Sequence, residues 1–296
     1  MMNSPYFDET PRLLRETLRR FVAKEVVPQA PAWEEQGFVP RQVLREMGRC
    51  GFLGLRHPEK YHGGGMGALA TALLAEELGR SGFGGFAATV LVHTDMASPH
   101  LARAGSPAQL ERWMPGIVAG DLITAVAVTE PDAGSDVKSI RTAARREGGG
   151  WRLRGSKTFI TNGALAAMAM GESARALELT LEYVRTRKAF GAPLWDKQAL
   201  RQRLAALAAR IEAGRELVCR AAWLDAQGRD CVKEVSMAKA YCGELVNEVM
   251  YDCLQFHGGA GYMRGSDIER MARDARVQSI GGGATEVMLE EVAKRL

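Results

Sequence analysis

Four short segments of the sequence contain residue types that could together bind a large polar ligand. Residues 126–136 and 157–163 each combine an apolar run with a threonine-containing turn, which presents a hydroxyl and backbone N–H groups at one place. Residues 185–194 contain arginines, whose planar guanidinium can bond a phosphate group in two places. Residues 255–262 contain adjacent glycines, which let the backbone approach a ligand closely. Taken alone, each feature is more typical of a strand-ending turn or a solvated helix end than of a ligand site.

Three zones of the chain must position these segments. The pattern predicts a helical domain over residues 1–121, a small β-domain over 122–163 and a four-helix bundle over 164–296, so the predicted fold class is mostly α with a small β middle domain. The bundle is predicted from apolar residues at helical spacing, which form one face of each helix. Examples are Leu200, Leu204, Leu207, Ile211 and Val218 in one helix, and Val235, Ala238, Cys242, Leu245 and Val249 in another.

The β zone is predicted from apolar runs and turn residues. Residues 122–128 form a short apolar run that predicts a strand ending at Glu130-Pro131. Residues 141–146 and 151–153 flank three glycines and predict a hairpin, and residues 157–161 predict a further strand. Three or four strands leave open sheet edges whose backbone groups need covering.

Composition and charge exclude several function classes. The 296 residues carry a net charge of +4 and are 46% hydrophobic and 25% charged, which is typical of a globular protein with a core. No basic stripe with interleaved aromatics is present, so nucleic-acid binding is not predicted, whereas a mild positive balance suits an anionic ligand. No apolar run approaches the roughly 18 residues of a membrane span, and the N-terminus lacks the pattern of a secretory signal. The five cysteines, Cys50, Cys219, Cys231, Cys242 and Cys253, form no C-x-x-C pair and predict a reducing compartment such as the cytoplasm.

The four segments occur in the order of the acyl-CoA dehydrogenase signatures, which they resemble, and so do residues 57–64 in the first helical zone. The resemblance covers nearly the whole chain. It implies an FAD-dependent enzyme of fatty acyl metabolism that introduces a double bond between Cα and Cβ of an acyl-CoA thioester. It also implies an electron-transfer flavoprotein as acceptor and a homodimer or homotetramer. An acyl-CoA oxidase or nitroalkane oxidase of the same fold is a further alternative, because the sequence does not reveal oxygen access.

The resemblance also assigns residues to the FAD site. One subunit would contribute the strand residues at the flavin ring, a residue that meets CoA or a cofactor phosphate, and the cofactor side of the last helix. The strand residues at the flavin ring would be Val126, Val128, Thr129, Phe159, Ile160 and Thr161. The residue that meets CoA or a cofactor phosphate would be Ser135, and the last helix would contribute Thr285 and Glu286. The neighbouring subunit would contribute the pyrophosphate arginine, residues on the adenine and ribose side, and a glycine loop. The pyrophosphate arginine would be Arg187, and the residues on the adenine and ribose side would be Phe190 and Gln198. The glycine loop would contain Gln255, Gly258 and Gly259.

Two departures from the family concern catalysis and length. Most members carry a glutamate base just before the last helix, where this chain has Gly282. Long-chain and isovaleryl-type members, which this stretch resembles, place the glutamate at the start of an earlier helix. In this chain, counting back along the helix that precedes Arg185 to the place of that glutamate reaches Thr161-Asn162, and neither residue is a glutamate. About ninety residues of the usual family length are missing after Gly163. The catalytic residue is therefore unknown, and a catalytically inactive acyl-CoA-binding subunit is the alternative function. A naturally shortened protein and a sequence from which a segment has been omitted both remain open.

Overall fold

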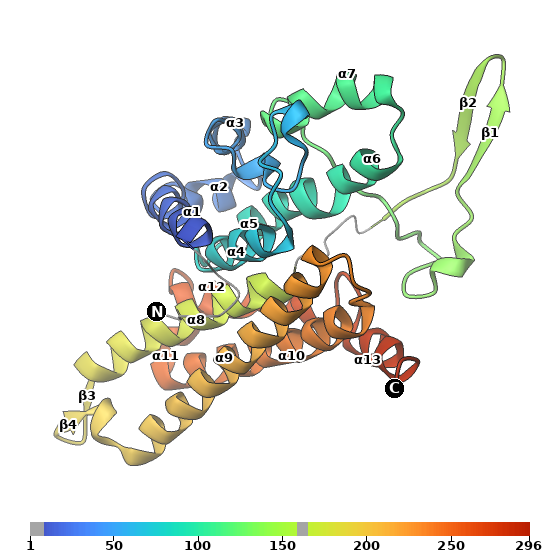
Figure 1. Ribbon diagram of the computed structural model, residues 1–296. Coiled ribbons are helices and arrows are strands. Elements are labelled where there is room, and N and C mark those ends of the chain that lie inside the picture. The colour runs from blue at the N-terminus through green and yellow to red at the C-terminus, as the bar shows by residue number, and fades with distance from the viewer. Residues whose placement is uncertain (1–8, 159–164) are drawn as a thin grey trace.

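The computed structural model describes residues 9–158 and 165–296, and these residues are mostly helical. Figure 1 shows the N-terminal helices as one group, the long C-terminal helices as a second group beneath it, and a β-hairpin that projects to one side. The predicted fold class, mostly α with a small β part, is confirmed.

The N-terminal group contains seven α-helices among the described residues. They are α1 (Glu9–Phe21), α2 (Ala30–Gln36), α3 (Arg41–Arg49), α4 (Ala68–Gly79), α5 (Gly84–Leu91), α6 (Ser98–Ala104) and α7 (Pro107–Val118). The helical path of α1 continues through Val22–Val26 and stops before Pro28, which cannot donate a helical hydrogen bond. Leu18, Met47 and Leu78 are fully buried in the shared core of this group.

The C-terminal group is built on three long helices, α8 (Leu165–Thr186), α9 (Gln198–Ala226) and α10 (Val232–His257), which lie alongside one another (Figure 1). The short α11 (Gly259–Tyr262), α12 (Asp267–Ala275) and α13 (Thr285–Ala293) complete the group. Leu207 of α9 and Leu245 of α10 are fully buried, as their helical spacing predicts, and Met170 of α8 belongs to the same core.

The two helical groups meet where α4 crosses α8, and glycines make this crossing possible. A Cβ atom at Gly171 would lie 2.0 Å from the backbone oxygen of Glu76, and one at Gly79 would lie 2.3 Å from that of Met168. Any larger side chain at either position would therefore push the helices apart. Arg80 of α4 and Glu178 of α8 form an ion pair of 2.6 Å beside this contact.

The β part is smaller than predicted. Strands β1 (Ala143–Glu147) and β2 (Gly150–Arg154) form the predicted antiparallel hairpin, and both turn glycines have positive φ angles. The strand predicted for residues 122–128 is wrong, because this segment has no regular structure and pairs with no described strand. An apolar run becomes a strand only where a neighbour completes its hydrogen bonds. Of the strand predicted over 157–161, residues 157 and 158 are irregular and the others lie outside the described residues.

A second, two-residue strand pair joins α8 to α9. It consists of β3 (Lys188–Ala189) and β4 (Ala192–Pro193), which pair in antiparallel fashion. Among the helices that the structure describes, none is long and apolar enough to cross a membrane.

Candidate functional site

The first two candidate segments lie side by side. The Thr158 N–H donates to the Thr129 carbonyl at 2.9 Å, and the Lys157 ammonium donates to the Val128 carbonyl at 2.7 Å. Val126 and Thr129 are half-buried and Val128 is 41% exposed, while Ser135 is exposed on the following loop. The structure thus places Thr129 beside the segment that leads to Phe159, Ile160 and Thr161, which themselves lie outside the described residues.

Glu130 holds this arrangement together, although the sequence suggested only a turn residue. Its carboxylate accepts hydrogen bonds from the backbone N–H groups of Arg141 and Thr142, at 2.7 and 2.9 Å, and lies 3.0 Å from the Lys157 ammonium. The bond from the Arg141 N–H, together with the Thr142 hydroxyl and Lys157, lowers the pKa of Glu130 to about 2. The carboxylate therefore ties the turn both to the start of the hairpin and to residue 157.

The third and fourth segments meet at one end of the long helices. The Tyr183 ring stacks on His257 with 4.4 Å between centroids, and the Tyr183 hydroxyl donates to the His257 carbonyl at 3.2 Å. This contact brings the β3–β4 turn close to the segment that contains Gln255, Gly258 and Gly259, all three of which are exposed. Gln198 is also exposed, at the start of α9.

Two side chains of the β3–β4 hairpin face solvent. Phe190 is 94% exposed and has a φ angle of 54°, which is uncommon for a residue other than glycine. Arg187 is exposed as well, and its guanidinium forms no ion pair with any residue in the described ranges. In contrast, the guanidinium of the nearby Arg185 lies over the Trp195 ring at 5.2 Å.

Lys239 binds the glycine-containing loop that precedes α13, at residues 278–283. The Lys239 ammonium donates to the Gln278 carbonyl at 2.6 Å and to the Gly283 carbonyl at 3.0 Å. Gly282 has a φ angle of 63° and offers no side chain to take a proton. Thr285 is buried in the first turn of α13, and the neighbouring Glu286 is exposed.

The candidate residues therefore form sets that one chain does not bring together. The β3–β4 hairpin lies at the opposite end of the molecule from both the β1–β2 hairpin and α13 (Figure 1). Arg187 and Phe190 consequently cannot meet Thr129 or Thr285 within a single subunit.

A carboxyl group in the core also went unrecognised in the sequence. Glu172 of α8 is 1% exposed and accepts a hydrogen bond from the side-chain amide of Gln278. Burial raises the pKa of Glu172 to about 8, and the nearby Asp274 carboxyl adds to this rise. Helical spacing alone does not distinguish such a buried acid from a surface one.

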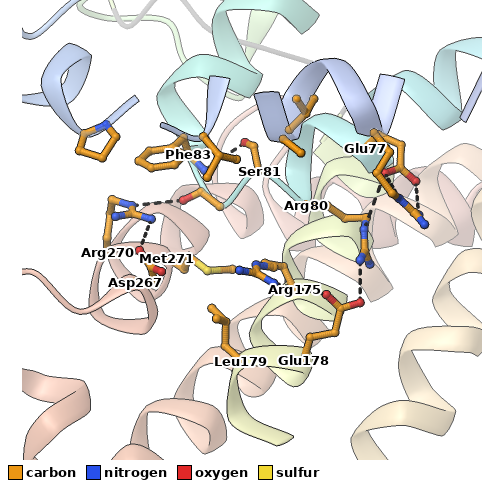
Figure 2. A pocket seen from close by; sticks show the side chains of 16 residues that line it. Glu77, Arg80, Ser81, Phe83, Arg175, Glu178, Leu179, Asp267, Arg270 and Met271 are labelled. Atoms are coloured by element: carbon orange, nitrogen blue, oxygen red, sulfur yellow. Dashed lines mark hydrogen bonds and ion pairs between the residues drawn. The ribbon is translucent and has the colours of Figure 1, made fainter. Parts of the chain in front are cut away.

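A cavity of about 470 Å³ between α1, α4, α8 and α12 is lined by charged residues, but they are paired with one another (Figure 2). Arg80 pairs with Glu178, and Arg270 pairs with Asp267 at 2.8 Å and lies over the Phe83 ring at 4.0 Å. None of the candidate residues from the sequence lines this cavity. The network joins the two helical groups and is structural.

Comparison with known proteins gives a consistent result for both helical groups. The family description "Acyl-CoA dehydrogenase, N-terminal domain" matches residues 8–121, and "Acyl-CoA dehydrogenase, C-terminal domain" matches residues 148–296. The mouse long-chain specific acyl-CoA dehydrogenase is 31% identical over 96% of this chain and 86% of its own length. An acyl-CoA dehydrogenase of Bacillus subtilis is 28% identical over 96% of this chain and 97% of its own length. The crystal structure of an acyl-CoA dehydrogenase from Geobacillus kaustophilus superimposes with a TM-score of 0.92 at 28% identity, and 99% of each chain is covered.

The mouse alignment also measures the missing length. It extends over 370 residues, whereas this chain has only 296, so at least 74 positions have no counterpart here. The internal shortening expected from the sequence is therefore a property of this chain relative to its relatives.

Proposed function

Because the chain belongs to the acyl-CoA dehydrogenase family of oxidoreductases, we propose that it binds FAD and acts on the Cα–Cβ bond of an acyl-CoA thioester. In this reaction class, FAD supplies the hydride acceptor for the hydrogen that leaves Cβ. The observation that carries the proposal is the division of the candidate residues into two sets at opposite ends of the molecule, which a second copy of the chain can join.

One half of the proposed site lies around the turn that Glu130 fixes. Val126, Val128 and Thr129 would line the polar edge of the flavin, with Phe159, Ile160 and Thr161 following residue 158. Ser135 would meet the CoA portion or a cofactor phosphate, and Thr285 and Glu286 would stand on the cofactor side of α13. The hydrogen bond between Thr129 and Thr158 supports this half, because it joins the two segments that have to share the ring.

The other half would come from the neighbouring subunit. Arg187 would bond the pyrophosphate, Phe190 and Gln198 would lie on the adenine and ribose side, and Gln255, Gly258 and Gly259 would approach the cofactor with their backbone. The Arg187 guanidinium is exposed and has no ion pair within residues 9–158 and 165–296, and the Phe190 ring is 94% exposed. Both side chains fit this function, because they would gain partners when the cofactor and a second copy are present. A homodimer or homotetramer follows from the proposal, with an electron-transfer flavoprotein as the electron acceptor.

A second candidate function is binding without catalysis. It is favoured by Gly282, which stands where most relatives of this family carry their base, and by the missing positions that would otherwise wall the site. In this form the chain would hold FAD or acyl-CoA and would not remove the α-proton.

Anaerobic spectroscopy separates the two candidates. The purified protein should carry a flavin spectrum that bleaches when the correct acyl-CoA is added, if the first candidate is right. A stable flavin spectrum that acyl-CoAs from short to long chain fail to bleach would support the second candidate. Protein that neither contains flavin nor takes up added FAD would contradict both, once mass spectrometry has shown that the expressed chain has the printed length.

A further inference from the structure

A second cavity, of about 330 Å³, lies between α4 and the C-terminal helices and is lined mostly by small apolar side chains. Alanines from four helices contribute to its wall, among them Ala72, Ala75, Ala167, Ala221 and Ala238. Small residues usually allow helices to pack closely, but here they leave a space at the lower end of the range found for ligand sites.

One polar atom in this wall, Oδ1 of Asp95, has no hydrogen-bonding partner among the residues that the structure describes. The Asp95 side chain is only 6% exposed, and its Oδ2 accepts a hydrogen bond from the Thr94 hydroxyl at 2.5 Å. Oδ1 accepts no hydrogen bond of normal length and angle from any described residue, and the closest Arg56 nitrogen in ion-pair contact with it is 3.8 Å away. Burial raises the pKa of Asp95, although Thr94, Arg56 and Thr71 act in the opposite direction. A buried acceptor left in this state is costly, so a donor from a ligand would be stabilising.

The charges around the cavity restrict the kind of donor. Arg56, Arg103 and Lys239 line it together with Asp95 and Asp225, so cationic groups outnumber carboxylates. A ligand ammonium would meet these cations, and a ligand carboxylate would meet Asp95. A neutral hydroxyl on an otherwise apolar molecule avoids both conflicts and satisfies Oδ1.

The cavity also adjoins the candidate functional site. Lys239 lines it, and the same ammonium donates to the Gly283 carbonyl in the loop before α13. We propose that this cavity binds the hydrocarbon part of a hydroxylated ligand whose hydroxyl donates to Asp95 Oδ1. For the acyl part, this inference rests on the proposed function: the ligand is then an acyl-CoA whose acyl chain carries a hydroxyl group.

The test uses alanine-methyl NMR of the whole protein, because alanines from four helices report on the cavity directly. The probes are 1-hexanol and its isomer methyl pentyl ether, which has the same atoms but no donor. We expect hexanol to bind about tenfold or more tightly than the ether, as one hydrogen bond to a carboxylate implies, and to shift alanine methyls of α4, α8, α9 and α10. Equal affinities, or shifts confined to other alanines, would overturn the proposal.

Variants of the two cavity carboxylates provide the control. Asp95→Leu should abolish the preference for hexanol while the ether still binds, and the more conservative Asp95→Asn should reduce it. Asp225→Asn, which changes the other acid of the wall, should leave the preference unchanged. A preference that persists in both Asp95 variants would overturn the assignment of Oδ1.

A third comparison separates this inference from the proposed function. Hexanoyl-CoA and 6-hydroxyhexanoyl-CoA are added to the same labelled protein. Preferential binding of the hydroxylated thioester supports both. Discrimination between hexanol and the ether without any thioester binding supports the cavity and contradicts the proposed function. Thioester binding with no discrimination in either pair overturns the inference and leaves the proposed function standing.

Discussion

Replacement of Glu172 by glutamine should stabilise the protein at neutral pH, and the gain should grow with pH. Glu172 is buried inside the C-terminal helices, and the Gln278 amide donates to one of its oxygens. Its other oxygen and the side-chain oxygen of Gln278 both lack a donor within the described residues. A proton on Glu172, or the amide of a glutamine at this position, supplies a missing donor without burying a charge.

The size of the effect follows from the pKa of Glu172, which rises from 4.5 to about 8 on folding. Below pH 4.5 the carboxyl is protonated in both states, so it does not make stability depend on pH. Between pH 4.5 and 8, unfolding releases a proton, so the free energy of unfolding falls by up to about 1.4 kcal/mol for each pH unit. At pH 7 the loss is on the order of 3 kcal/mol, and above pH 8 it levels off.

Urea unfolding at pH 5 and pH 8 measures this difference. We expect wild type and Glu172→Gln to be close in stability at pH 5 and the variant to be clearly more stable at pH 8. Glu182→Gln is the matched control, because it makes the same change at an exposed position of the same helix, and its effect should be small at both values. If Glu172→Gln changes stability equally at both pH values, or destabilises only at pH 8, Glu172 is ionised in the folded protein and the reasoning is wrong.

Three further predictions concern the proposed site. Arg187→Ala should weaken FAD retention by about 1.5–3 kcal/mol and more than Arg185→Ala does, since only Arg187 is proposed to bond the pyrophosphate; equal FAD affinities would contradict the assignment. Gly282→Glu should restore little dehydrogenase activity in the flavin-bleaching assay. The φ angle of 63° at this position is unfavourable for a residue with a side chain, and the chain lacks positions that would wall the proposed site. Rapid bleaching by the variant would show that the shortened β part suffices. Light scattering at micromolar concentration should show a homo-oligomer, and a well-folded monomer would exclude a site shared between subunits.

The helices could be predicted from the sequence because their burial is periodic. Leu204, Leu207 and Ile211 of α9 recur at helical spacing, and all three are buried. The β1–β2 hairpin could be predicted because its signal is local, with Gly148 and Gly149 supplying the positive φ angles that the turn needs. A local signal of this kind could not show whether residues 122–128 form a strand. Its existence depends on a neighbouring strand, and the apolar run alone does not show whether that neighbour is present.

The candidate site was accessible to sequence reasoning only where it resembles the family. Thr129 and Arg187 lie in recognisable segments, whereas the sequence indicates only a turn at Glu130 and nothing at Asp95 or Glu172. Their importance comes from burial and from missing or multiple hydrogen bonds, which a local pattern does not encode.

The shortening of this chain affects the proposed site but not the helical scaffold. The α4–α8 crossing, with Gly79 and Gly171 at the contact and Arg80 paired with Glu178, joins the two helical groups without help from the β part. The strands β1 and β2 are exposed along their whole length and contribute nothing to the buried clusters. The helical scaffold can therefore remain close to that of its relatives although at least 74 aligned positions are missing. A cooperative unfolding transition would consequently report on the scaffold alone, and only flavin binding and bleaching report on the site.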